Sequence, residues 1–197
     1  MTMRDPMRQI LRDERGVSAV EFALLAPLFF LFLFGIFDLT YQFYGKAVLN
    51  GAVEEAGRMA TIEANSSDPS ALDATVRAQV ARANKNAVLT FSRKSYKDFT
   101  DVGMGEEFTD DNANGVRDPA ECYEDANNNA VWDNDRGAAG NGGAKDVVVY
   151  TVSMTYDRIF PMWKMLGQPQ SKTITTQTIL RNQPFDEQDD TVNVICV

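Results

Sequence analysis

An apolar run near the start of the chain restricts what this sequence can fold into. The run covers residues 17–37, 21 positions with a single ionisable side chain, Glu21, and Asp38 closes it. At about 1.5 Å of rise per residue, a helix of this length reaches roughly the 30 Å needed to cross the hydrocarbon of a bilayer. A secretory signal peptide fits poorly, because its apolar core is about 7–15 residues long and a small-residue cleavage site follows it. The sequence therefore predicts a transmembrane helix over residues 17–38.

The charges that flank this run predict its orientation. Four arginines precede it: Arg4, Arg8, Arg12 and Arg15. Lys and Arg residues keep short flanking segments on the cytoplasmic side of a membrane. We therefore expect a single-pass protein with its N-terminus in the cytoplasm and its C-terminal domain exported.

The junction between the charged start and the apolar run is a candidate cleavage site. A cut after Gly16 would leave Val17 as the new N-terminus and make Glu21 the fifth residue. An ionisable group inside a bilayer costs at least a few kcal/mol unless it is paired. Glu21 therefore either lies near the headgroups or pairs with the α-amino group of Val17 on a neighbouring subunit, which would set the register of helices in a filament. Pro27 lacks an N–H and loosens the helix, which suits a helix that leaves the bilayer.

These residues resemble a known family. The segment Glu14-Arg-Gly-Val-Ser-Ala-Val-Glu-Phe-Ala-Leu-Leu-Ala-Pro-Leu28 is similar to the N-terminus of TadE-like minor pilins of the tight-adherence (Flp, type IVb) pilus. Residues 50–60 and 173–181 resemble the family's alanine-rich stretch and last strand, whereas the middle of the chain departs from it. The resemblance implies that a prepilin peptidase cuts between Gly16 and Val17. It also implies that the assembly residues are Glu21, Phe22 and Pro27.

The resemblance further implies a minor pilin, or pseudopilin, that primes or enters a pilus for surface attachment. The implied partners are the major pilin, other minor pilins, the prepilin peptidase and the inner-membrane assembly platform. The implied location is the bacterial inner membrane, with the head in the periplasm, and then the pilus or cell surface. Two alternatives stay open: an uncleaved single-pass protein with an exported calcium-binding ligand or adhesion domain, and a pseudopilin of a type II secretion system.

Composition argues against catalysis. The sequence contains no histidine, which removes Ser–His–Asp, Cys–His and His–metal chemistry. We therefore expect neither an enzyme nor a small-molecule substrate. The two cysteines, Cys122 and Cys196, favour one disulfide in an exported domain. It would close a loop of about 75 residues and restrict the unfolded chain by roughly 4 kcal/mol; two free thiols, or pairing with a partner chain, are the alternatives.

The acidity of the chain is concentrated in one segment. Residues 98–135 contain twelve acids and one arginine, a net charge of −11, whereas the whole chain carries −9 and the remainder therefore +2. Such a surface is unsuited to nucleic acids. A run of like charge this dense either stays disordered as a solvated linker or binds cations.

The spacing within this segment favours calcium. Residues 110–121 match the twelve-residue EF-hand loop, which has oxygen ligands at positions 1, 3, 5, 7, 9 and 12 and glycine, here Gly115, at position 6. The predicted ligands are Asp110, Asn112, Asn114, the carbonyl of Val116, Asp118 and Glu121. No convincing helices flank the loop, so we expect structural calcium, as in dockerin or thrombospondin-type repeats.

A second loop repeats this spacing fifteen residues later. Its predicted ligands are Asp125, Asn127, Asn129 and Asp133. The copy is degenerate, because Ala130 replaces the glycine and Arg136 stands at the twelfth position, with Asp135 nearby.

The whole pattern predicts an α+β fold. We expect a long N-terminal helix packed on a small antiparallel sheet, pilin-like, with an acidic metal-binding loop insertion. Strands are expected at residues 88–91, 147–156 and 173–180, which are rich in Val, Thr and Tyr. The expected segments are a leader (1–16), the transmembrane helix (17–38), its exported continuation (39–65), a second helix with the first strand (66–97), the calcium-loop segment (98–143) and the C-terminal strands (144–197).

Overall fold

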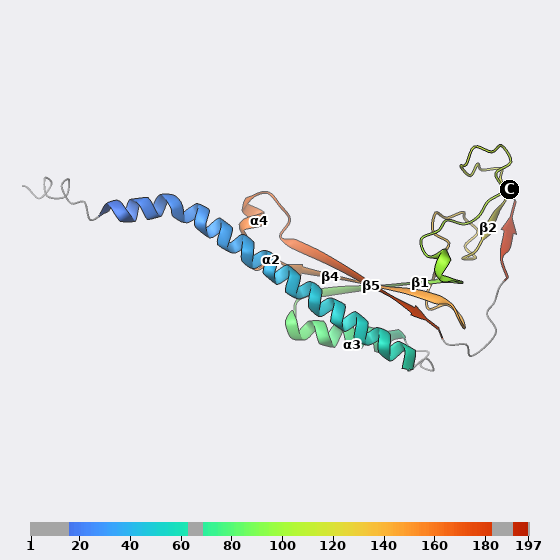
Figure 1. Cartoon of the computed structure of the whole chain (residues 1–197), viewed down its shortest axis with the longest axis horizontal. Coiled ribbons are helices and arrows are strands. Elements are labelled where there is room, and N and C mark those ends of the chain that lie inside the picture. The colour runs from blue at the N-terminus through green and yellow to red at the C-terminus, as the bar shows by residue number, and fades with distance from the viewer. Residues whose placement is uncertain (1–15, 63–68, 183–190, 197) are drawn as a thin grey trace, which may run out of the picture. The chain divides into compact units, whose positions relative to one another are not determined.

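A computed structural model describes residues 16–62, 69–182 and 191–196 (Figure 1). Residues 1–15 of the predicted leader, and the predicted boundary between residues 65 and 66, lie outside the described residues. The chain divides into two compact units. The first combines the chain up to Phe43 with Arg158–Gln170, and the second combines Tyr44–Asp157 with the chain from Ser171 onwards.

Helix α2, Val17–Ile62, passes through both units. Pro27 lies inside it without ending it. In its first half the apolar side chains are exposed on all sides of the helix, with Leu24 76% and Phe32 62% exposed. A helix that is apolar all round is suited to hydrocarbon or to a protein interior. Among the described residues it is the one helix long and apolar enough to cross a membrane.

The rest of the first unit is a loop, Arg158–Gln170, which folds against this part of α2. It contains the short helix α4, Met162–Met165. The ring of Phe160 stacks on that of Phe34, with centroids 4.5 Å apart. The connection between two strands of the second unit is therefore packed on the apolar half of the helix, which the sequence did not predict.

The second unit contains a four-stranded antiparallel sheet in the order β3-β1-β4-β5. Its strands are β1 (Val88–Tyr96), β3 (Ala138–Ala139), β4 (Val147–Asp157) and β5 (Ser171–Arg181). Alternate residues of the central strand β4 are buried, as a sheet with one covered face requires. They are Val148, Tyr150, Val152, Met154 and Tyr156. The other face is polar, and Ser153 and Thr155 hydrogen-bond to threonines of β5.

Two helices cover the apolar face. Helix α3, Pro69–Ala83, buries Val76 and Val80, and the second half of α2 buries a stripe at helical spacing. The stripe consists of Leu49, Ala52, Val53 and Ala56, each at most 1% exposed. A Cβ added to Gly57 would lie 3.2 Å from the side chain of Leu180, so glycine lets α2 approach the sheet closely. Burial of each valine or leucine contributes about 1.5–3 kcal/mol.

The acidic segment has its own small framework. It begins with the 3₁₀-helix η2 (Phe99–Asp101), and its strand β2 (Tyr123–Asp125) pairs antiparallel with β6 (Asn193–Ile195). Beside this pair, Cys122 and Cys196 are joined in a disulfide, the arrangement that the cysteine count favoured. The bond links the acidic segment to the end of the chain.

The α+β prediction is confirmed in its main features, a long apolar N-terminal helix and a small antiparallel sheet. Strand β1 continues to Tyr96, beyond the predicted end at residue 91. The metal-binding role of the loop insertion stays a prediction.

A partly buried polar contact joins α3 to the sheet and provides a test of this packing. Asp73 accepts hydrogen bonds from Arg93 Nη2 at 2.5 Å and from the Tyr150 hydroxyl at 2.7 Å. We expect Asp73→Ala to lower the free energy of unfolding by about 2 kcal/mol, because the Tyr150 hydroxyl, on a residue 1% exposed, loses its acceptor. Chemical denaturation of the full chain in detergent, followed by near-ultraviolet circular dichroism, measures this. Glu55→Ala, at an exposed position of α2, is the control and should change stability by less than about 0.5 kcal/mol; equal effects of the two substitutions would contradict the prediction.

Candidate functional sites on the helix and in the acidic segment

The candidate cleavage and assembly residues lie at the exposed start of α2. Gly16 immediately precedes the helix, and Val17 is its first residue. Glu21 follows about one turn later and is exposed, as is Phe22 at 62%. Pro27 is exposed in the middle of the apolar stretch. These side chains point outward, so they are placed to contact lipid or another helix.

The first acidic loop is closed by carboxylates that accept main-chain N–H groups. Asp110 accepts from the N–H groups of Asn114 at 3.1 Å and Gly115 at 2.8 Å. Glu121, only 3% exposed, accepts from the N–H groups of Asp111 at 3.0 Å and Asp118 at 2.8 Å. Position 12 thus holds the end of the loop to its start, and position 1 binds the turn at positions 5 and 6.

The predicted ligands in the middle of this loop converge on one another. The amide nitrogens of Asn112 and Asn114 donate to the same oxygen of Asp118, at 2.6 Å and 3.0 Å. The amide oxygens of both asparagines accept main-chain N–H groups within the loop. An amide oxygen has two lone pairs, so each of these oxygens retains capacity for a cation.

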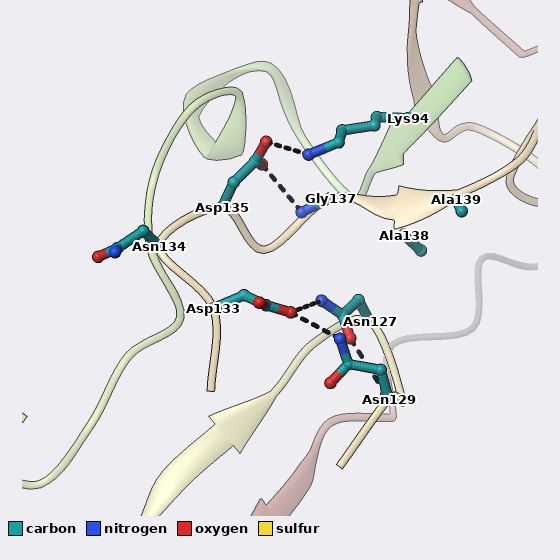
Figure 2. A pocket seen from close by; sticks show the side chains of 9 residues that line it. All are labelled: Lys94, Asn127, Asn129, Asp133, Asn134, Asp135, Gly137, Ala138 and Ala139. Atoms are coloured by element: carbon teal, nitrogen blue, oxygen red, sulfur yellow. Dashed lines mark hydrogen bonds and ion pairs between the residues drawn. The ribbon is translucent and has the colours of Figure 1, made fainter. Parts of the chain in front are cut away.

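The second loop repeats these contacts. Asp125 accepts from the N–H groups of Asn129 at 3.0 Å and Ala130 at 2.9 Å. The amide nitrogens of Asn127 and Asn129 donate to Asp133 at 2.9 Å and 2.6 Å (Figure 2). These two hydrogen bonds lower the pKa of Asp133 below its ordinary value.

The backbones of the two loops also correspond. Ala113 and Asn128, both at position 4, have φ of 57° and 59°. Gly115 and Ala130, both at position 6, have φ of 75° and 61°. A non-glycine residue rarely adopts this left-handed conformation. Ala130 therefore takes the turn that glycine makes in the first loop, and its replacement of glycine does not abolish the loop.

The twelfth position of the second loop is supplied from elsewhere in the chain. Glu106 accepts from the N–H groups of Ala126 and Asp133, both at 2.9 Å. These are positions 2 and 9, the two that Glu121 binds in the first loop. Glu106 is 3% exposed. Arg136, which stands at the twelfth position in the sequence, therefore does not make the contacts that Glu121 makes in the first loop.

Arg136 instead helps to position the segment that contains Glu106. Its Nε donates to the carbonyl of Gly105 at 3.0 Å, and its Nη1 pairs with Asp101 at 3.0 Å. The indole N–H of Trp132 donates to the carbonyl of Glu106, also at 3.0 Å. Arg136 and Trp132 thus hold the segment with Glu106 beside the second loop.

A further acid joins this segment to the main sheet. Asp135 pairs with Lys94 at 2.6 Å (Figure 2). It also accepts a hydrogen bond from the Tyr96 hydroxyl at 2.9 Å. Burial raises the pKa of Asp135, but the hydrogen bonds from Lys94, Tyr96 and the Gly137 N–H outweigh it, so the pKa is lowered. A Cβ at Gly137 would lie 2.6 Å from the Tyr96 ring, so this junction requires glycine.

The chemistry of the loops is that of hard oxygen donors. Over the described residues, no three His, Cys, Asp or Glu side chains form a group placed to hold a metal ion. Each loop instead combines carboxylates with asparagine amides and main-chain carbonyls, a mixture that suits calcium more than transition metals.

Comparison with known proteins gives one result. Residues 16–58 match the family model described as TadE-like protein. The match confirms the family resemblance and covers α2 as far as Arg58. The resemblance at residues 173–181 lies outside it and stays a prediction. No curated protein and no solved structure matches the chain.

The contact between Asp135 and Tyr96 predicts a pH dependence. Burial, and then the hydrogen bond to Asp135, raise the pKa of Tyr96 from 10.0 to about 12. Between these pH values the folded chain holds this proton more tightly than the unfolded chain, so the free energy of unfolding falls as pH rises through the window. The measurement is the phenolate absorbance of the wild type minus that of the Tyr96→Phe variant. This difference should appear near pH 12 in the folded protein and near pH 10 in denaturant. An absorbance difference that appears near pH 10 in both states would contradict the raised pKa of Tyr96.

Proposed function

The chain is TadE-like over residues 16–58, a family associated with the tight-adherence pilus, and from this premise we propose that it is a minor pilin. In this proposal α2 anchors the chain in the inner membrane until a prepilin peptidase cuts after Gly16. The mature subunit then primes or enters the filament, alongside the major pilin and other minor pilins, through packing of its apolar helix. The observation that carries the proposal is the family match across the cleavage junction and the exposed apolar half of α2.

The physical basis for assembly is the exposed apolar surface of α2. Side chains on all sides of the helix, among them Val20, Leu25 and Phe29, are more than half exposed. Such a surface is stable only in lipid or against other apolar helices. Transfer from bilayer to filament keeps it out of water in both states.

Glu21 supplies specificity in this proposal. Its carboxylate lies one turn from Val17 on an apolar surface, where an unpaired charge costs at least a few kcal/mol. Cleavage creates an α-amino group at Val17. Pairing of that group with Glu21 of a neighbouring subunit would neutralise both charges and set the axial register of the helices.

Two measurements test the filament proposal. In cells that carry the prepilin peptidase, the mature chain should begin at Val17. The Glu21→Gln variant should be cut normally, but its amount in sheared filaments should fall at least about tenfold. The reason is that loss of the pairing between Glu21 and the α-amino group of Val17 costs more than about 1.4 kcal/mol. Glu54→Gln, at an exposed position of the same helix outside the apolar half, is the control for Glu21. N-terminal sequencing and immunoblotting of sheared pili measure both effects.

Two results would contradict the filament proposal. A chain that keeps residues 12–16 in the presence of the peptidase would contradict cleavage and favour an uncleaved single-pass membrane protein. A normally cut chain that is recovered only with a type II secretion apparatus would favour a pseudopilin of that system.

We also propose that the two acidic loops bind structural calcium, one ion each. Support comes from the repeated network, in which Glu121 and Glu106 bind positions 2 and 9 of their loops in the same way. In each loop the donors include the carbonyl at position 7, from Val116 and Val131. Calcium would replace the hydrogen bonds from the asparagine amide nitrogens to Asp118 and Asp133, and it would offset the negative charge of the buried carboxylates.

The calcium proposal predicts two sites that substitutions remove one at a time. Equilibrium dialysis of the full chain should find two calcium ions bound at millimolar concentration, the range expected of extracellular modules. Glu106→Gln and Glu121→Gln should each leave about one ion, because each removes a bidentate carboxylate. Glu107→Gln, next to Glu106 but with a side chain 70% exposed, should keep both. Retention of both ions by Glu106→Gln would contradict its role, and no binding by the wild type would contradict the proposal.

A further inference from the structure

The loop Arg158–Gln170 of the first unit presents a group of apolar side chains that the described residues of that unit leave exposed. Met165 is 85% exposed, Ile159 63% and Leu166 56%. They lie in or beside the short helix α4. Exposed apolar side chains gathered in this way mark a contact surface.

Hydrogen bonds close the loop at its base, so its conformation is fixed and the exposed side chains are held outward. The N–H of Arg158 donates to the carbonyl of Gln170 at 3.0 Å. The side-chain amide of Gln170 donates back to the carbonyls of Arg158 at 2.6 Å and Phe160 at 3.1 Å. One glutamine thus fastens the ends of the loop together.

The loop is attached where the apolar part of α2 ends. Phe160 packs between Phe34, with ring centroids 4.5 Å apart, and Phe37, with centroids 6.2 Å apart. Arg158 pairs with Asp38 at 3.6 Å, and Asp38 is only 7% exposed. Asp38 lies about 30 Å along the helix from Val17, at 1.5 Å per residue, which is the thickness of the hydrocarbon. If α2 spans the bilayer from Val17, as proposed above, the loop would lie at the depth where hydrocarbon gives way to headgroups.

The polar groups of the loop suit the same depth. The guanidinium of Arg158 lies 4.3 Å from the centroid of the Trp163 ring. The Trp163 ring is partly buried by this contact, and its indole N–H is buried. Lys164, next to it, is exposed, and a lysine at this level can extend its ammonium to lipid phosphates.

We propose that this loop is a second membrane contact, which inserts Ile159, Met165 and Leu166 into the interface of the bilayer beside α2. The inference rests on the proposed membrane anchoring of α2. The partner is lipid, because the loop continues the apolar surface of the helix and adds an exposed cation, Lys164, to it. The ion pair of Arg158 with Asp38 neutralises the acid that ends the apolar run. The loop fixes the depth of the helix and must leave the lipid when the subunit is extracted.

Site-directed spin labelling of the full chain tests this. Both native cysteines are disulfide-bonded, so Met165→Cys and Leu166→Cys each provide one labelling site. The chain is reconstituted at low density in phosphatidylcholine–phosphatidylglycerol vesicles. The label should be severalfold more accessible to oxygen, which partitions into lipid, than to a water-soluble nickel chelate. Val88→Cys, at a position 64% exposed at the start of β1, is the matched control and should show the reverse ratio.

The possible outcomes separate this inference from the proposed function. A chain that does not float with the vesicles contradicts the membrane anchor itself. A chain that floats, with labels at positions 165 and 166 that behave like the one at position 88, leaves the anchor intact and overturns the loop contact. Labels shielded from both reagents at high protein density, but open to the nickel chelate at low density, would show that a neighbouring subunit covers the loop, and this too overturns the lipid contact.

Discussion

The packing of one helix against one face of a sheet holds the second unit together. From Leu49 to Ala56, α2 buries a narrow stripe of side chains, and glycine at position 57 lets the helix approach Leu180 of β5 closely. The same helix, closer to its start, exposes apolar side chains on every side. A single continuous element therefore has to satisfy two environments. In the second half the fold supplies the neighbours, whereas in the first half only the loop Arg158–Gln170 covers part of the helix among the described residues.

The acidic segment holds many like charges close together. It does so mainly with neutral donors, because main-chain N–H groups bind Asp110, Glu121, Asp125 and Glu106. Arg136 and Lys94 add positive charge at the edges, and the disulfide holds the segment to the end of the chain. This arrangement orders the oxygen donors but leaves the net negative charge largely uncompensated. A bound divalent cation would compensate it most directly.

The proposed pilin function makes mechanical demands that the proposed calcium sites and the proposed lipid contact of the loop would meet. An apolar helix that moves from lipid into a filament needs a head that stays folded during extraction. The disulfide and the proposed calcium ions would brace the most highly charged part of that head. The loop Arg158–Gln170, attached to α2 at Asp38, would set the starting depth of the helix.

The sequence by itself determined the features that depend on neighbours along the chain. The apolar run predicted the long helix, alternation predicted β4 and β5, and regular spacing predicted the first acidic loop, because periodicity and turn geometry are local properties. Only the tertiary structure placed Glu106, which precedes Asp125 by 19 positions, at the twelfth position of the second loop. It also brought Arg158 to Asp38. Both contacts join residues that are far apart in the sequence and follow no regular spacing. No sequence pattern therefore predicts them, because they depend on how the intervening chain folds.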